Sequence, residues 1–468
     1  MQNKSAYVWG LLNRFLPSLL SIIATMIMAR FLSPEDFGAI GVVSIIFFVA
    51  RTLIDSGFGG SLINENDLKD VDYSTVSVFN IVMGLGLYGL IIVFSGIIED
   101  YFEISNLRYV VILLGLTLVI SPFGLVPNTI LQKNLRFSDL CKISVISIIL
   151  ANVISLVMAF NGFGVYALVA NQVLQSLFSV IMYYAYSHYR LSFHFSYNSL
   201  RKLFKFGFFT ALSSMVDEIY ENLLTSLTGK YLNVQQAGYL SQSKRLEEAF
   251  SISLTSAISS VSFPILSKIK DDENAFMKEC GSVYRIILLI SVPLLVIIAI
   301  FSKEVISIML GSQWIEASFY LKALSVAGIF MVMETLIRIF IKSHGDAPAL
   351  FYYTVLKRVI GICLIILCML ISRDLMIYGY VAGSFMAFVI NSILFCRITK
   401  GNVLRLLLQT TLYAIPSLII WAGIYVIELF TDITLVGRII YVAITFMIYT
   451  IIVLRVLGYN LILKRIFK

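Results

Sequence analysis

Charged residues interrupt two neighbouring apolar stretches near the middle of the chain. The first stretch, SSMVDEIYENLLTS, carries Asp217, Glu218 and Glu221. The second stretch, SQSKRLEEAF, adds two cations and two carboxylates, which are Lys244, Arg245, Glu247 and Glu248. Carboxylates inside such stretches can exchange protons or bind cations, and basic side chains can hold an anionic group. Both stretches are therefore candidates for a polar functional site.

These charges cannot all face lipid. One charged side chain at the middle of a lipid-facing helix costs about 2.5–3.5 kcal/mol, so the charges of the two stretches together would cost on the order of 20 kcal/mol. That sum exceeds the typical net stability of a folded domain. At about 100° per residue, Asp217, Glu218 and Glu221 share one face of a helix, and the charges of the second stretch also share a face. We therefore expect each helix to have one polar face and one lipid face.

Two interpretations of these polar faces are open. The charges can form ion pairs that lock two helices together, such as Lys244 with Glu248 at i, i+4. Alternatively, they line a polar cavity. We favour the cavity because three other apolar stretches also carry polar side chains, which are Asn13 and Arg14, Arg51 and Asp55, and Glu334 and Arg338.

The composition indicates a membrane protein with many spans. Of the 468 residues, 59% are hydrophobic and 13% are charged, whereas soluble chains are about 25% charged. The first apolar stretch, residues 7–28, is long enough to cross a bilayer and no small-residue cleavage site follows it, so we expect a retained helix. The net charge of +8 favours contact with anionic lipid or an anionic substrate. The dispersion of the basic residues argues against nucleic acid.

We predict an all-α polytopic membrane protein with about fourteen transmembrane helices, each about 20 residues long. The apolar runs are continuous, unlike the alternating strands of a β-barrel. The predicted spans lie near 7–29, 38–60, 74–98, 108–127, 142–160, 163–185, 206–228, 236–262, 282–301, 317–341, 352–371, 377–396, 406–427 and 436–454. Lys and Arg concentrate in alternate loops, which places both termini in the cytoplasm. This distribution treats Lys357 and Arg358 as cytoplasmic cations.

A basic connection divides the chain. In SHYRLSFHFSYNSLRKLFKF, the apolar residues Leu200, Leu203 and Phe204 share one helix face and basic residues occupy the other, a pattern typical of a helix in the membrane interface. The predicted division is an N-terminal six-helix lobe (1–190), a basic interfacial linker (191–205), a C-terminal six-helix lobe (206–400), and a C-terminal helix pair with a basic tail (401–468).

The loop RFLSPEDFG predicts the start of the second helix. Ser33 is expected to cap it, with Pro34 at the first helical position and acidic residues in the first turn. We interpret this loop as a structural anchor.

Common catalytic signatures are missing from the sequence. It contains no G-x-x-x-x-G-K-[ST], G-x-S-x-G or H-E-x-x-H motif, so it offers no phosphate loop, serine nucleophile or zinc helix of those types. The five cysteines show no C-x-x-C spacing and the three histidines form no metal pattern. We therefore predict no catalytic residues, no metal and no cofactor, and a protein that is not an enzyme.

Several blocks of sequence resemble one family. ARFLSPEDFGAIGVVSIIFFVARTLIDSGFGGSLI is similar to the first two spans of bacterial lipid-linked oligosaccharide flippases, the O-antigen, capsule and exopolysaccharide type. ILQKNLRFSDL, NGFGVYALVANQ, AGYLSQSKRLEEAFSISLTSAISSVSFPILSKI and LGSQWIEASFYLKAL resemble later blocks of that family, so the likeness covers about residues 5–345. The family belongs to the multidrug/oligosaccharidyl-lipid/polysaccharide exporter superfamily.

The resemblance implies a fold and a function. The fold would be two pseudo-symmetric six-helix lobes in a V, with a cavity that opens alternately to each side of the bacterial inner membrane. The substrate would be undecaprenyl diphosphate carrying an oligosaccharide, and membrane lipid and the polysaccharide polymerase and chain-length machinery would be partners. In a relative that moves the peptidoglycan precursor, basic residues of spans one, two and eight engage the diphosphate, and the matching spans here offer Arg14, Arg51 and Arg245.

The candidate residues form two groups. The predicted substrate-binding residues are Arg14, Arg51, Arg245, Lys244, Asn13 and Arg338. The predicted coupling and cavity residues are Asp55, Asp217, Glu218, Glu221, Glu247 and Glu248. Because Glu247 and Glu248 neighbour Arg245, the sequence leaves open whether this arginine contacts substrate or is paired internally.

Two other functions stay open. A cation-coupled multidrug antiporter of the same superfamily would need titrating carboxylates in the first lobe, where Asp55 is the clear candidate. A membrane glycan polymerase would need a large outer loop, and the predicted outer loops are short.

Overall fold

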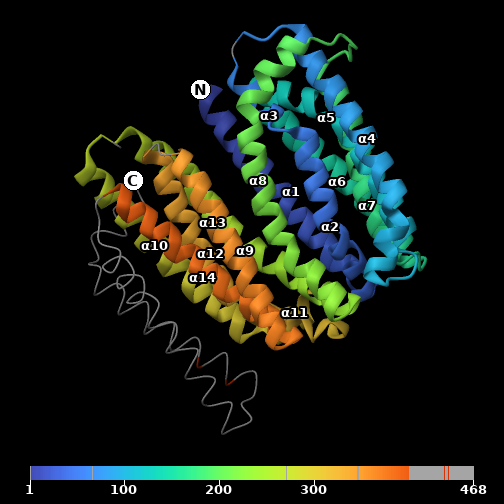
Figure 1. Ribbon diagram of the computed structural model, residues 1–468, viewed down its shortest axis with the longest axis vertical. Coiled ribbons are helices and arrows are strands. Elements are labelled where there is room, and N and C mark those ends of the chain that lie inside the picture. The colour runs from blue at the N-terminus through green and yellow to red at the C-terminus, as the bar shows by residue number, and fades with distance from the viewer. Residues whose placement is uncertain are drawn as a thin grey trace. The chain divides into compact units, whose positions relative to one another are not determined.

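A computed structural model describes residues 2–65, 67–269, 271–344 and 347–399, together with Gly437 and Tyr441. The described segments are helical and contain no β-strand. The helices of the first half are α1 (Gln2–Met28), α2 (Pro34–Asp55), α3 (Phe58–Asn64), α4 (Asp70–Phe102), α5 (Leu107–Lys133), α6 (Phe137–Phe160) and α7 (Val165–Ser187) (Figure 1). Those that follow are α8 (Tyr197–Tyr231), α9 (Val234–Lys268), α10 (Glu273–Ile300), α11 (Ser302–Met309), α12 (Ala317–His344), α13 (Ala347–Ile371) and α14 (Met376–Ile398), with short 3₁₀ turns at Ser312–Trp314 and Arg373–Leu375.

The helices confirm the all-α polytopic prediction. Each of the first twelve predicted spans falls on a helix, while 406–427 and 436–454 lie outside the described residues. Within the described segments, nine helices are long and apolar enough to cross a membrane. Helices α8 and α9 are not among the nine, and they are the two that carry the interrupting charges.

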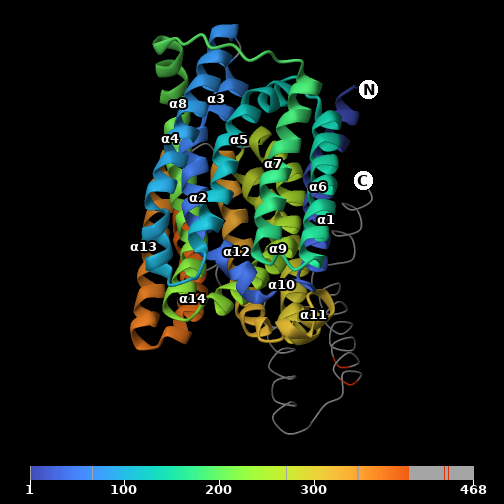
Figure 2. The same ribbon diagram turned by 90° about the vertical axis from the view of Figure 1, so that its right-hand side faces the viewer.

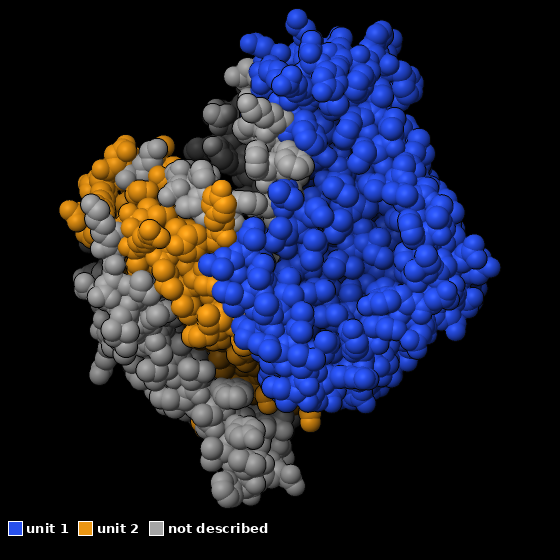
Figure 3. Space-filling view, in the orientation of Figure 1, with its two compact units in different colours: residues 1–249, 306–320, 354–380 blue, residues 250–305, 321–353, 381–468 orange. Residues whose placement is uncertain are grey.

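The chain forms two compact units (Figure 3). Unit 1 comprises residues 1–249, 306–320 and 354–380. Unit 2 comprises residues 250–305, 321–353 and 381–468. The pairing of two six-helix lobes in a V stays a prediction.

The start of α2 confirms the predicted cap. Ser33 Oγ accepts a hydrogen bond from the Asp36 backbone N–H at 3.3 Å, and the Ser33 N–H donates to Asp36 Oδ2 at 2.9 Å. Pro34 occupies the first turn, where its missing N–H costs nothing. The predicted span 38–60 falls within the apolar segment Pro34–Ile63, but α2 stops at Asp55 inside it. Ser56 and Gly57 then adopt left-handed backbone (φ 45° and 74°) before α3 begins.

Helix α2 packs closely against α8 and α9 within unit 1. A Cβ placed on Gly38 would lie 1.9 Å from the Val234 carbonyl oxygen, and a Cβ on Gly238 would lie 1.9 Å from the Pro34 carbonyl oxygen. Only glycine permits so close an approach of two helix backbones. One turn further along α2, Ser226 of α8 donates its hydroxyl hydrogen to the Val42 carbonyl at 2.8 Å. These contacts fix the two charged helices against the second span.

Helices α4, α5 and α7 pack on α2, and α1 and α6 lie on the outer side of α7. Figure 2 shows α6 between α1 and α7, and α7 also packs on α5. A buried apolar cluster joins α2, α4, α5 and α7 and includes Val43, Phe47, Val111, Leu118 and Val169. This cluster holds the polar faces of α2, α5 and α7 in fixed positions.

The predicted interfacial linker is partly the beginning of α8. Ser74 of α4 donates to the carbonyl oxygens of Ser192 and His194, and α8 begins at Tyr197. Leu203 is buried against Phe58 and its neighbours. The apolar face of this segment therefore contacts protein, and the interfacial position of its basic face stays a prediction.

Candidate functional site

The charges of α8 and α9 meet in one network of unit 1. Lys244 Nζ lies 3.0 Å from Glu221 Oε2 and 3.7 Å from Glu248 Oε1. The same ammonium donates to the Glu221 backbone carbonyl. Its side chain is 14% exposed, so Lys244 is a paired, largely enclosed cation. The structure therefore contains ion pairs between α8 and α9, as the first of the two interpretations expects.

Arg358 of α13 completes the network from outside the two stretches. Its Nε lies 2.7 Å from Asp217 Oδ1, and one Nη lies 3.2 Å from Glu221 Oε1. The arginine side chain is 12% exposed, and Lys357 beside it is 1% exposed. The treatment of Lys357 and Arg358 as cytoplasmic loop cations is wrong. They lie in α13, where burial of a cation requires partners.

Two stacked tyrosines enclose this network. Tyr380 of α14 donates its hydroxyl hydrogen to Glu221 Oε2 at 2.9 Å, and its ring stacks on Tyr220 with the ring centres 5.6 Å apart. The Arg358 guanidinium lies 4.4 Å from the centre of the Tyr220 ring, a cation–π contact. Gly361 makes room, because a Cβ there would lie 2.5 Å from that ring.

Arg358 and Tyr380 are residues that the sequence reasoning missed. Arg358 stands near the beginning of an apolar span, and the sequence analysis counted it among the cytoplasmic cations. Tyr380 gives no signal of its own because tyrosine is common in membrane helices. The only available signal was the excess of carboxylates on α8 and α9, which required further cations.

The other acidic residues lie beside the network. Glu218 follows Asp217 on α8 and accepts a hydrogen bond from Asn222 Nδ2 at 3.4 Å. Glu247 of α9 is 3% exposed. Among the described side chains, Lys244 and Arg358 thus face carboxylates at Asp217, Glu221 and Glu248, with Glu218 adjacent.

Arg245 interacts electrostatically with Glu248 but makes its side-chain hydrogen bond elsewhere. Its guanidinium donates to Ser21 Oγ of α1 at 2.7 Å. Within the described segments, no carboxylate lies within ion-pair distance of it, so the structure does not pair Arg245 with Glu247 or Glu248. Asn13, also on α1, has a buried Oδ1 with no hydrogen-bond donor among the described groups. The side chain of Arg14 lies outside the description.

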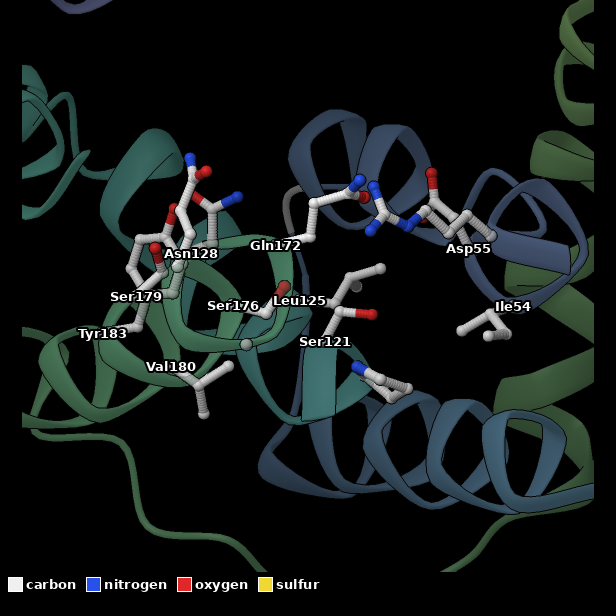
Figure 4. Close-up of a pocket in the computed structure, with 14 residues that line it drawn as sticks. Ile54, Asp55, Ser121, Leu125, Asn128, Gln172, Ser176, Ser179, Val180 and Tyr183 are labelled. Carbon is white, nitrogen blue, oxygen red and sulfur yellow. The ribbon is translucent and has the colours of Figure 1, made fainter. Parts of the chain in front are cut away.

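Arg51 and Asp55 open onto a polar pocket of about 480 Å³ (Figure 4). Asp55 Oδ1 accepts a hydrogen bond from the Gly59 backbone N–H at 3.2 Å. Arg51 forms neither a hydrogen bond nor an ion pair with any described residue, although Asp55 is one turn away. The pocket is lined from α2, α5 and α7 by Arg51, Ile54, Asp55, Ser121, Pro122, Gly124, Leu125, Asn128, Gln172, Gln175, Ser176, Ser179, Val180 and Tyr183.

Arg338 belongs to unit 2. It lies on α12 one turn after Glu334, whose Oε1 accepts a hydrogen bond from Asn391 Nδ2 at 2.6 Å. Glu334 is 6% exposed, so this part of α12 is enclosed. A role for Arg338 in substrate binding stays a prediction.

The unpaired arginines define the chemistry that unit 1 offers. A guanidinium presents a planar fork of donors that matches two oxygens of a phosphate or carboxylate. Such a group without a carboxylate partner inside a membrane span is expected to face water or an anionic ligand. Arg51 satisfies this description, and Arg245 of α9 also has no carboxylate within ion-pair distance among the described side chains, whereas Lys244 and Arg358 are paired with carboxylates.

The chain is similar to several known proteins in sequence and in fold. The family described as polysaccharide biosynthesis protein matches residues 27–319. The teichuronic acid biosynthesis protein TuaB of Bacillus subtilis (strain 168) is 27% identical over 65% of this chain and 63% of its own length. The lipopolysaccharide biosynthesis protein WzxC of Escherichia coli (strain K12) is 22% identical over 74% of this chain and 71% of its own. The solved structure of the lipid II flippase MurJ has a TM-score of 0.76 and 17% identity, and covers 95% of this chain and 98% of its own.

Proposed function

The chain belongs to the family of polysaccharide biosynthesis proteins, and from this premise we propose that it moves a lipid-linked oligosaccharide across the cytoplasmic membrane. The substrate is undecaprenyl diphosphate carrying a saccharide repeat, used for O-antigen, capsule or exopolysaccharide. The protein acts as a carrier and makes or breaks no bond of its substrate. The name and fold of MurJ, a lipid II flippase, support a substrate of this class.

One observation carries the proposal, namely that Arg51 of α2 and Arg245 of α9 have no carboxylate within ion-pair distance among the described side chains. A diphosphate carries about two negative charges, and moving it through a region of low dielectric constant requires fixed cations. A hydrogen bond to a charged group contributes about 1.5–3 kcal/mol, so losing one arginine should weaken binding about tenfold to a hundredfold.

The transport mechanism is alternating access. The diphosphate and sugars enter a polar cavity between the six-helix lobes 1–190 and 206–400, while the polyprenyl chain stays in lipid. The cavity then opens to the other side. Binding at unpaired cations suits such a cycle, because the substrate can leave without breaking an ion pair between helices.

The acidic residues are candidates for coupling. Asp217, Glu218, Glu221 and Glu248 cluster around the ion pairs of Lys244 and Arg358. A bound proton or sodium ion would balance the excess negative charge, and release of that cation would restore the negative charge. Asp217→Asn should then remove the dependence of export on an ion gradient in membrane vesicles. Wild-type dependence at normal abundance would make Asp217 a structural partner of Arg358.

The proposal includes a cellular setting. The protein lies in the bacterial inner membrane with both termini in the cytoplasm, so the substrate is collected where its sugars are added. The polymerase and chain-length proteins that use the exported repeat are its expected partners.

A deletion strain tests the function. Loss of the gene should trap saccharide-bearing undecaprenyl diphosphate on the inner leaflet, detected by lipid extraction and mass spectrometry. Wild type should clear it, Arg51→Lys should clear part of it, and Arg51→Ala should clear little while accumulating normally in the membrane. No trapped lipid in the deletion strain would refute the function. Full clearance by Arg51→Ala would show that Arg51 is not required for transport.

The cation-coupled antiporter is a second candidate because Asp55 lines the polar pocket. That function predicts raised drug sensitivity in the deletion strain without trapped lipid, and loss of resistance in Asp55→Asn. The same strain therefore separates the two functions.

A further inference from the structure

The serine hydroxyls of the polar pocket differ from several hydroxyls elsewhere in the spans, although Thr117 and Ser291 also lack a partner among the described groups. Ser44, Thr129 and Ser155 donate to a carbonyl oxygen one turn back in their own helix at 2.8–2.9 Å. The pocket serines form no such bond, nor any other side-chain hydrogen bond with the described residues; they are Ser121, Ser176 and Ser179. In a membrane span, hydroxyls normally satisfy themselves on the backbone. The three pocket hydroxyls are therefore available to bind a ligand or water.

The carboxamides of the pocket are also available. Gln172 and Gln175 form no side-chain hydrogen bond within the described segments. Asn128 Oδ1 accepts from Gln132 Nε2 at 3.2 Å, and its Nδ2 has no described acceptor. Each free amide supplies donors and an acceptor in the same plane. Because burying such groups without partners costs free energy, these part-exposed amides favour a polar ligand or water over an apolar one.

An aromatic ring closes one end of the pocket. A Cβ on Gly124 would lie 3.0 Å from Val180 Cγ2 and 3.3 Å from Tyr183 Cδ2, so Gly124 lets the Tyr183 ring lie against α5. In Figure 4, Asn128, Ser179 and Tyr183 lie at one end of the pocket, Asp55 at the other, and Gln172 between them. Arg51, one turn before Asp55, belongs to the cationic end.

We propose that this pocket, between α2, α5 and α7, binds the sugar that is bonded to the diphosphate and so selects saccharide-bearing lipid over bare lipid diphosphate. The assignment rests on the proposed function and adds a recognition site to it. With the diphosphate at Arg51, the first sugar enters the neutral end among Asn128, Gln172 and Ser179. Sugar hydroxyls both donate and accept, as do these side chains.

The size and polarity of the pocket fit a saccharide. Its 480 Å³ lies within the range of about 300–1,000 Å³ typical of small-ligand sites. A hydrophobic drug would leave the amides and hydroxyls unpaired, which opposes its binding. The Tyr183 ring offers an apolar face for the C–H groups of a pyranose.

Equilibrium binding in lipid nanodiscs tests the assignment with two probes. One is undecaprenyl diphosphate, and the other is the saccharide-bearing lipid purified from the deletion strain. Wild type should bind the second more tightly. Gln172→Leu, which keeps the size of the side chain, and Ser179→Ala should each weaken binding of the saccharide-bearing lipid about three- to tenfold and leave the bare lipid unchanged.

Thr129→Val is the matched control, because Thr129 follows Asn128 on α5 but its hydroxyl bonds to the Leu125 carbonyl. It should bind both probes as wild type does. Equal binding of the two probes by wild type, or unchanged preference in Gln172→Leu and Ser179→Ala, would overturn the saccharide pocket alone and make it a water-filled space. Binding of neither probe by wild type would overturn the proposed function together with this assignment.

Discussion

Arginine stands in two electrostatic settings within the spans of unit 1. Arg358 makes ion pairs with Asp217 and Glu221, whereas Arg51 and Arg245 have no carboxylate within ion-pair distance in the described segments. Removing one partner of an enclosed pair leaves an uncompensated charge, while removing an unpaired cation does not. Stability and transport should therefore separate between these arginines.

Arg358→Leu should lower the free energy of unfolding by about 3–5 kcal/mol, because Asp217 and Glu221 would both lose this largely enclosed cation. Thermal unfolding of purified protein in detergent measures it. Arg358→Leu with Asp217→Leu should recover part of the loss. The control Arg373→Leu removes an exposed arginine bonded only to the Tyr231 carbonyl and should change little. If Arg358→Leu is as stable as wild type, the ion pairs of Arg358 with Asp217 and Glu221 do not stabilise the fold.

The same measurement on Arg51→Leu should show no loss of stability, since no described carboxylate depends on this cation. Its export should nevertheless fall, because the fork for the diphosphate is gone. If Arg51→Leu unfolds as readily as Arg358→Leu, then Arg51 is structural.

At the residue scale, sequence alone placed most of the charged site. The period of the helix put Asp217 and Glu221 on one face, and the structure joins that face to Lys244. It could not supply Arg358 and Tyr380, which are more than a hundred residues away in the chain. Pairing of that kind depends on how helices pack, and a single sequence does not encode it locally.

At the scale of helices, the crossing of α2 and α9 positions the site. Gly38 and Gly238 bring the two backbones together, and both charged helices then pack on the second span. The sequence predicted twelve of these helices and the Ser33 cap, since both follow from local patterns. The break at Ser56 and Gly57 was missed although a Ser-Gly pair is a turn signal, because apolar residues continue on both sides of it.

Gly38→Ala and Gly238→Ala should each destabilise the protein by at least about 1–3 kcal/mol, since the added methyl meets backbone that cannot move aside. Gly60→Ala and Gly86→Ala are matched controls in membrane helices, because nothing lies within 4 Å of a Cβ there. Thermal unfolding in detergent compares the four variants. If the two pairs are indistinguishable, α2 and α9 do not cross at these glycines.

At the scale of the whole molecule, the basic loops set the orientation in the membrane. Reporter fusions after Asn106, Lys230 and Arg373 should be active on the periplasmic side, and a fusion after Lys202 on the cytoplasmic side, because Lys and Arg collect in cytoplasmic loops. A fusion at Lys468 should also report the cytoplasm. A periplasmic signal there would contradict the even number of spans.

Transport by the purified protein tests the central claim most directly. The protein is reconstituted into liposomes that carry saccharide-bearing undecaprenyl diphosphate on the inner leaflet, and a glycosidase outside cleaves only the sugars that have crossed. Wild type should expose the lipid faster than protein-free liposomes, and Arg51→Ala should lose most of that increase. Equal exposure with wild type and without protein, across proton and sodium gradients of either direction, would contradict the account.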